Sequence, residues 1–302
     1  MPAGAITAAP PGEARPVRIG RILLMVPAGV LLGIFLAGPL GYLLPFGFLV
    51  NHGMRTSFAG GFTLRNYTIV LADGFYLTIL LRTVLMALAV TVCSLVIGWP
   101  LAYFLSRVGP RWKSLLTLAV VAPLMISIPV RNYGWIVILG DNGLFNAALR
   151  SLGLIDVPLQ LMFTDLSVVI GLTHVLMPFV VLAVLASLDG IGPTLSEAAE
   201  TLGAGRIAVI RHVLLPLTMP GIAAGATLVF CVAVSAYVTP ALMGPSGARY
   251  APVLVYQQFL SAFNWPRGTA IATVLLVITG FAVTVFLALL NRRHAHLMRL
   301  GT

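Results

Sequence analysis

The chain has 302 residues, of which 59% are hydrophobic and only 9% are charged, and its mean hydropathy is +1.03. Soluble domains have about 25% charged residues, so this composition excludes an ordinary soluble domain and indicates a polytopic α-helical membrane protein. The net charge of +10 does not indicate nucleic-acid binding, because most of the basic residues fall between or beyond apolar runs, as the positive-inside bias predicts.

The N-terminal part of the chain predicts a tail followed by a first span. Residues 1–20 are rich in Ala, Pro and Gly without apolar periodicity, which predicts a disordered cytoplasmic tail. The apolar run at about 22–50 is longer than the core of a signal peptide, which has about 7–15 residues. It therefore predicts an uncleaved transmembrane helix.

Five further apolar runs are long enough to cross a hydrocarbon core of about 30 Å. They lie at about 77–105, 115–139, 167–188, 219–242 and 269–290. The sequence thus predicts an all-α bundle of about six transmembrane helices over residues 21–291. Both termini would be cytoplasmic, including a C-terminal tail at 292–302, and the protein would be a multi-pass protein of the bacterial inner (plasma) membrane.

A polar loop at 189–220 separates the fourth and fifth runs. Thr194 followed by Glu197 has the spacing of a capping box, in which each residue bonds the other's backbone N–H. The expected short helix runs from about 195 to 202. Gly203 can take the left-handed conformation that ends a helix.

A second short helix is expected at about 206–214, before Pro216. The loop would form a helix–turn–helix on the membrane surface, either an ordinary connector or a docking site for a soluble protein. Its apolar face is too small to form a domain alone and consists of Leu195, Ala198, Ala199 and Leu202.

No residues in the chain suggest an enzyme. Lys113 is its only lysine and follows Trp112, so the G-x-x-x-x-G-K-[ST] phosphate loop is absent. ATP hydrolysis would have to come from a separate polypeptide. Cys93 and Cys231 both lie in apolar runs and are interpreted as small core residues rather than a disulfide or metal pair. We expect no catalytic residue, metal or cofactor.

The loop contains a Glu-Ala-Ala triplet, a glycine after three intervening residues and a Leu-Pro pair near its end. This spacing resembles the EAA motif of membrane-spanning subunits of binding-protein-dependent ABC importers, with Val213 where isoleucine is common. The resemblance implies the type I ABC importer permease fold. It also implies a coupling helix seated on one of two ATP-hydrolysing subunits, a second homologous permease subunit, and an extracytoplasmic substrate-binding protein. The residues that would form the coupling loop are Glu197, Ala198, Ala199, Glu200, Gly203, Leu215 and Pro216.

The resemblance covers nearly the whole chain from about Phe62 and extends to the spermidine/putrescine branch of these permeases. The stretches that carry it include 130–135, 141–146, 237–242 and 256–260. They imply a permease for a small organic cation, with a polyamine as the expected substrate. His174 stands where that branch is expected to have a tyrosine. Permeases for opines, amino-acid-like compounds, phosphonates or iron have similar sequences in these stretches, so these substrates remain alternatives.

A polyamine path should offer aromatic faces, carbonyls and carboxylates. The five candidate residues for it are Tyr133, Trp135, His174, Tyr237 and Tyr256. The aromatic residues could instead form a belt at the outer membrane interface, and His174 could simply bond a neighbouring helix.

Three arginines run against the positive-inside bias at the expected outer helix ends. Arg82, Arg131 and Arg267 either snorkel to lipid headgroups or line the path. No clear acidic residue lies in the middle of a span, which argues against a proton-coupled secondary carrier. A structural scaffold is disfavoured by the ordered motif of the loop.

Overall fold

The computed structural model describes residues 26–27, 29–51, 61–247 and 249–299, so the predicted tail at 1–20 lies outside the described residues. These residues form helices joined by turns. Within them, the one β contact is an isolated bridge between Leu49 and Phe62. The chain divides into two compact units, Met1–Pro45 and Phe46–Thr302.

The first unit carries most of the predicted first span. A π-helix, η1 (Gly33–Ala37), continues into α2 (Gly38–Leu43), and the 3₁₀-helix η2 (Leu44–Phe48) follows at the boundary of the two units. Together they belong to an apolar segment, Gly29–Phe48, that is long enough to cross a membrane. The first run predicted from the sequence therefore includes a helical span.

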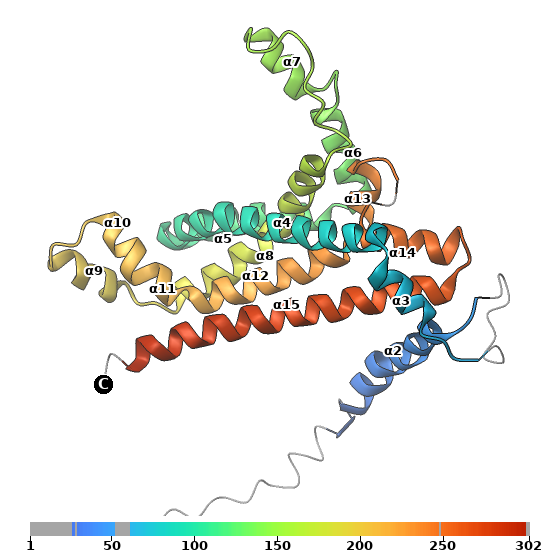
Figure 1. Ribbon diagram of the computed structural model, residues 1–302. Coiled ribbons are helices and arrows are strands. Elements are labelled where there is room, and N and C mark those ends of the chain that lie inside the picture. The colour runs from blue at the N-terminus through green and yellow to red at the C-terminus, as the bar shows by residue number, and fades with distance from the viewer. Residues whose placement is uncertain (1–25, 28, 52–60, 248, 300–302) are drawn as a thin grey trace, which may run out of the picture. The chain divides into compact units, whose positions relative to one another are not determined.

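The second unit contains long helices, among them α4, α8, α12 and α15, that lie side by side in a bundle, together with shorter helices (Figure 1). In chain order they are α3 (Arg65–Ala72), α4 (Gly74–Arg107), α5 (Pro110–Val121), η4 (Ala122–Met125), α6 (Ile128–Leu139), α7 (Leu144–Ser151), α8 (Asp165–Asp189), α9 (Pro193–Thr201), α10 (Arg206–Val209), η5 (Ile210–Leu214), α11 (Leu215–Leu217), α12 (Met219–Ser235), α13 (Val238–Met243), α14 (Ala251–Leu260) and α15 (Trp265–Arg299).

The number of spans agrees with the prediction of about six. Four helices of the described chain are long and apolar enough to cross a membrane, and two further pairs qualify if each bent pair counts as one span. One of these, α4, has 34 residues and extends over about 51 Å at 1.5 Å per residue. It is therefore longer than the hydrocarbon core.

Helices α4, α8 and α12 pack against one another and form the core of the bundle. Small residues allow this close approach, as is common between membrane helices. A Cβ atom at Gly98 of α4 would lie 3.0 Å from Val180 of α8, and one at Gly225 of α12 would lie 3.1 Å from the Val180 Cα. The three helices thus meet around Val180, which is fully buried.

The third span is not the continuous helix that the apolar run at 115–139 predicted. The segments Pro110–Met125 and Ile128–Ser151 meet at 97°, and Ser127 between them has an extended backbone (ψ 144°). Pro123 and Pro129 flank the break. Proline lacks an N–H donor and disfavours a helical residue before it. Hydropathy does not register such a break, because both segments are apolar.

Arg131 supports this break and does not snorkel to the surface, so that interpretation was wrong for this residue. Its side chain is only 8% exposed. The Nη2 atom donates to the carbonyl of Ile126 at 2.6 Å and also to that of Pro123. A buried guanidinium here satisfies carbonyl groups that the interrupted helix leaves near the bend.

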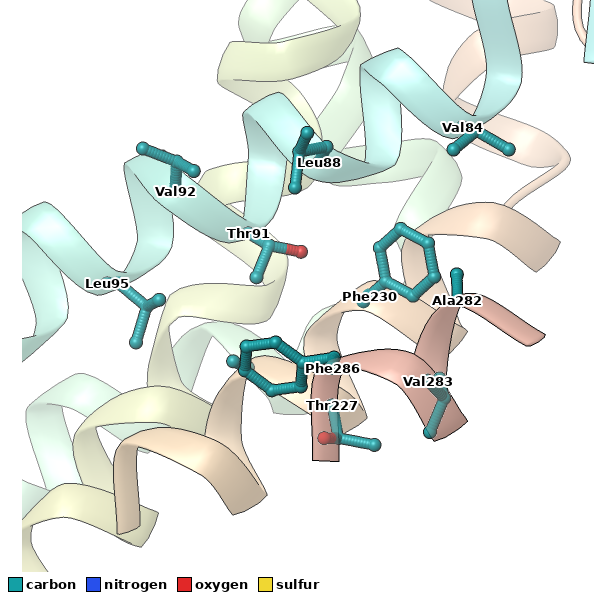
Figure 2. Close-up of a pocket in the computed structure, with 11 residues that line it drawn as sticks. Val84, Leu88, Thr91, Val92, Leu95, Thr227, Phe230, Ala282, Val283 and Phe286 are labelled. Carbon is teal, nitrogen blue, oxygen red and sulfur yellow. The ribbon is translucent and has the colours of Figure 1, made fainter. Parts of the chain in front are cut away.

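Helix α15 packs closely on α14 and α3 but more loosely on α4 and α12. The loose part leaves an apolar pocket of about 290 Å³, lined by residues of α4, α12 and α15 that include Phe230 and Phe286 (Figure 2). The helix continues to Arg299, beyond the predicted end at 290, so most of the predicted tail at 292–302 is helical.

Candidate functional site

The polar loop forms a short surface helix, α9, at the end of the bundle opposite α13 and α14 (Figure 1). The predicted capping box is wrong. Gly192 is the N-cap residue, Pro193 occupies the first turn, and no side chain caps the N-terminus. Proline presets the φ angle of the first helical position, so the helix begins at Pro193, two residues earlier than a Thr194 cap would allow.

The predicted end of the helix at Gly203 is confirmed. Gly203 has φ +86°, and its N–H donates to the Glu200 carbonyl at 2.9 Å. The N–H of Ala204 donates to the Ala199 carbonyl at 3.0 Å. These two bonds form a Schellman motif, and both alanines pack against the main core cluster. The turn is therefore fixed by local hydrogen bonds and by its contact with the bundle.

The second half of the loop returns the chain to the membrane. The predicted helix at 206–214 is present as α10 followed by a π-helical turn, η5. Leu215 and Pro216 then form the short α11, after which the axis bends by 65° into α12. The motif residues Leu215 and Pro216 thus lie at the bend between the loop and the fifth span.

The predicted apolar face of α9 does not turn as a unit toward the bundle. Leu195 is 51% exposed and Leu202 is 89% exposed, whereas Ser196 is buried. On the next helix, Ile207 is 81% exposed. The loop thus exposes three large apolar side chains, which a partner protein could cover.

Both acidic residues of the motif lie on the exposed side of this helix. Glu197 and Glu200 are exposed, and neither carboxylate forms an ion pair within the described residues. An ion pair near this end does link α5 and α8, where Lys113 Nζ lies 2.6 Å from the Asp189 carboxylate. The motif carboxylates are thus accessible to a basic partner surface.

The candidate path residues form two pairs rather than one site. Tyr237 and Tyr256 stack with ring centroids 4.3 Å apart, and both line a hollow of about 880 Å³ between α13 and α14. The hollow also has polar lining residues, including Gln160 and Gln257.

The second pair lies deeper in the bundle. Trp135 Nε1 donates to His174 Nδ1 at 3.3 Å, and the two rings meet edge to face. His174 lines a separate cavity of about 290 Å³. Tyr133 belongs to neither pair and is 59% exposed. The structure therefore supports the interpretation that His174 bonds a neighbouring helix and provides no single site that unites all five residues.

A polar cluster lies where α4, α8 and α14 begin, and one of its members, Arg82, was singled out from the sequence. Arg82 donates to both carboxylate oxygens of Asp165, at 2.9 and 2.5 Å, and Tyr250 donates its hydroxyl to the same carboxylate. Burial raises the pKa of the Tyr250 phenol, and Asp165 raises it further. Arg82 is therefore an ion-pair partner that ties α4 to α8, and Tyr250 joins the start of α14 to them.

This cluster should contribute measurably to stability. We expect Asp165→Asn to lower the thermal midpoint of the purified protein by about 2–4 °C, which corresponds to about 1 kcal/mol in a chain of this size. The physical reason is that the amide cannot pair with the Arg82 charge. Asp156→Asn, at an exposed loop position, is the control and should leave the midpoint unchanged. Equal midpoints for both variants would contradict the assignment.

Comparison with known proteins gives one family. The model of the family described as "Binding-protein-dependent transport system inner membrane component" matches residues 94–296. The spermidine/putrescine transport system permease protein PotB of Escherichia coli is 36% identical over 225 residues, covering 74% of this chain and 82% of the relative. PotB of Haemophilus influenzae is 32% identical, covering 82% of this chain and 86% of the relative. The E. coli inner membrane ABC transporter permease protein YdcU is 31% identical over 91% of this chain and 90% of its own length.

Solved structures show the same fold. A chain in the crystal structure of a bacterial ABC transporter involved in the import of alginate has a TM-score of 0.73 and 17% identity, covering 91% of this chain and 96% of that one. A chain of the MetNI methionine ABC transporter has a TM-score of 0.51 and 21% identity, covering 72% of this chain and 93% of that one. The all-α, type I importer permease fold predicted from the sequence is confirmed.

Proposed function

The chain belongs to the family of binding-protein-dependent transport system inner membrane components, and from this premise we propose that it is a permease subunit of an ATP-driven importer for polyamines such as spermidine and putrescine. The observation that carries the substrate assignment is the 36% identity to a spermidine/putrescine permease over 74% of the chain. The relatives are permeases rather than enzymes.

ATP hydrolysis is assigned to two partner subunits, because the sequence contains no phosphate loop. The loop at 189–220 would be the docking element for one of them. Support comes from α9, which presents Leu195, Leu202 and the carboxylates of Glu197 and Glu200 to the exterior. An exposed ion pair contributes only about 0–1 kcal/mol, so the shape and apolar surface of the loop would supply most of the docking energy.

The proposed assembly also contains a second homologous permease subunit and an extracytoplasmic binding protein. The loop would lie on the cytoplasmic side together with both termini. The hollow lined by Tyr237 and Tyr256 lies at the opposite end of the bundle, where the binding protein would deliver its ligand. Closure of the ATP-hydrolysing subunits would displace α9 and open the path to the other side.

The aromatic pair supports a cationic substrate in physical terms. Ring faces attract ammonium groups, with about 0.5–1 kcal/mol for an exposed contact and more when the cation is desolvated. The stacked rings of Tyr237 and Tyr256 border a hollow of about 880 Å³. Such a hollow is large enough for one end of an extended diamine or triamine.

The substrate assignment is tested by measuring the ligand of the cognate binding protein. We expect the purified binding protein to bind spermidine or putrescine in a calorimetric titration. The same protein should not bind amino acids, opines or phosphonates. Binding of one of those compounds without polyamine binding would overturn the substrate class but leave the importer assignment intact.

A further inference from the structure

Three side chains form a continuous column along one face of α4. Trp99, Tyr103 and Arg107 are spaced four residues apart, which places them on the same face of a helix. The Trp99 and Tyr103 rings are stacked at 5.8 Å with an interplanar angle of 4°. The Arg107 guanidinium lies over the Tyr103 ring at 5.2 Å, a cation–π contact.

The column contacts the predicted coupling loop at two places, α9 and the residue that precedes α12. Arg107 Nη2 approaches Ser196 Oγ of α9 at 3.4 Å, and Trp99 Nε1 donates to Thr218 Oγ1 at 3.1 Å. Among the described side chains of α9, Ser196 is the buried one, at 5% exposure. Thr218 is fully buried at the 65° bend before α12. The column therefore connects the surface helix to the start of the fifth span.

The surroundings of the column leave room for movement. A cavity of about 250 Å³ lies beneath α9, lined in part by Arg107, Ser196 and Leu214. Pro100 lies inside α4, next to Trp99. Because proline removes one helical hydrogen bond, α4 has a point of weakness at the level of the column.

An aromatic belt at the membrane interface would not explain these contacts. Belt residues place their polar groups among lipid headgroups, whereas the Trp99 N–H is bonded to a buried threonine of another helix. Trp99 and Tyr103 are also half-buried and pack against the main core cluster. Their partners are thus protein groups that belong to the loop and to its exit.

We propose that the Trp99–Tyr103–Arg107 column transmits the displacement of α9 to α4 and to the start of α12, and so couples ATP hydrolysis to transport. The proposal rests on the proposed function of the loop. The three residues are positioning residues, since they act through Ser196 and Thr218 and need not touch substrate. A displacement of α9 moves Arg107, and the stacked rings of Tyr103 and Trp99 transmit this displacement to the bend at Thr218.

The test uses the full importer, reconstituted with its partner permease, ATP-hydrolysing subunits and binding protein. Tyr103→Leu removes both ring contacts, whereas Tyr103→Phe keeps the ring. We expect Tyr103→Leu to lower spermidine imported per ATP hydrolysed by about tenfold, within the range of coupling energies carried by such residues. Tyr103→Phe should stay within about twofold of wild type. Phe104→Leu, at a neighbouring ring that is 54% exposed, is the matched control and should keep the wild-type ratio.

Arg107→Gln, at an exposed position, should also lower the spermidine imported per ATP hydrolysed. It serves as the test if the Tyr103→Leu protein does not assemble into the importer. A wild-type ratio in Arg107→Gln, with the complex intact, would overturn the inference. Should the wild-type importer not transport spermidine, the ligand that its binding protein holds serves in its place. Failure of the ATP-hydrolysing subunits to co-purify with the wild-type chain would instead refute the proposed function of the loop.

Discussion

Gly203→Asp is expected to abolish uptake. Gly203 has φ +86°, a left-handed backbone conformation in which a substitution is strained. The substitution would strain the Schellman motif that ends α9 and would add a third carboxylate beside Glu197 and Glu200. A Cβ atom at this position meets no atom of the chain within 4 Å. Steric conflict would therefore have to arise with the docked partner rather than within the loop.

The measurement is spermidine uptake together with ATP hydrolysis stimulated by the binding protein, in reconstituted complexes. Gly205→Asp is the matched control, because Gly205 has φ −67°, has open space around its Cβ position, and is the N-cap of α10, where Asp is favoured. We expect this variant to retain uptake. Wild-type transport and stimulation in Gly203→Asp would refute the role of this turn.

Gly221→Ala is expected to destabilise the bundle itself. The added Cβ would lie 2.5 Å from the backbone carbonyl of Ala183 in α8 and would collide with Ser187 Oγ as well. The serine can rotate, but the carbonyl belongs to the helix backbone, so α8 and α12 would have to separate. Overpacking of this kind costs about 1–3 kcal/mol. We expect a lower thermal midpoint and a smaller yield of assembled complex.

Gly280→Ala provides the same chemical change without the contact. Gly280 lies in α15, where a Cβ atom meets nothing within 4 Å, and replacement of a helical glycine by alanine favours the helix by about 1 kcal/mol. Its midpoint, measured on purified protein in detergent, should equal or exceed that of the wild type. Equal thermal midpoints for the two variants would show that close packing at Gly221 does not hold α8 against α12.

The coupling loop shows which predictions depended on local information. Gly203 was predicted to end the helix because few other residues adopt its conformation, and the two hydrogen bonds that define the turn join residues three and five positions apart. The predicted capping box also depended on neighbouring residues, but it was wrong. The Thr194–Glu197 spacing suits that motif, but Pro193 fits the first turn and moves the N-cap to Gly192.

The orientation of α9 could not be predicted from its apolar residues. Leu195 and Leu202 are exposed, and Ser196 is buried against Arg107. An isolated helix nine residues long has little packing of its own. Its orientation is set by where the loop is attached, and its exposed leucines suit a partner outside this chain.

The sequence by itself determined the membrane class, the approximate number of spans and the family, because apolar length and motif spacing are properties of neighbouring residues. Tertiary structure alone decided the 97° break, the contact of Trp135 with His174, and the pairing of Arg82 with Asp165, 83 residues away. Hydropathy assigns each side chain to lipid or water but does not specify its partner. That choice follows from the packing of α4, α8 and α12, which brings distant polar groups together in a medium where an unpaired group is costly.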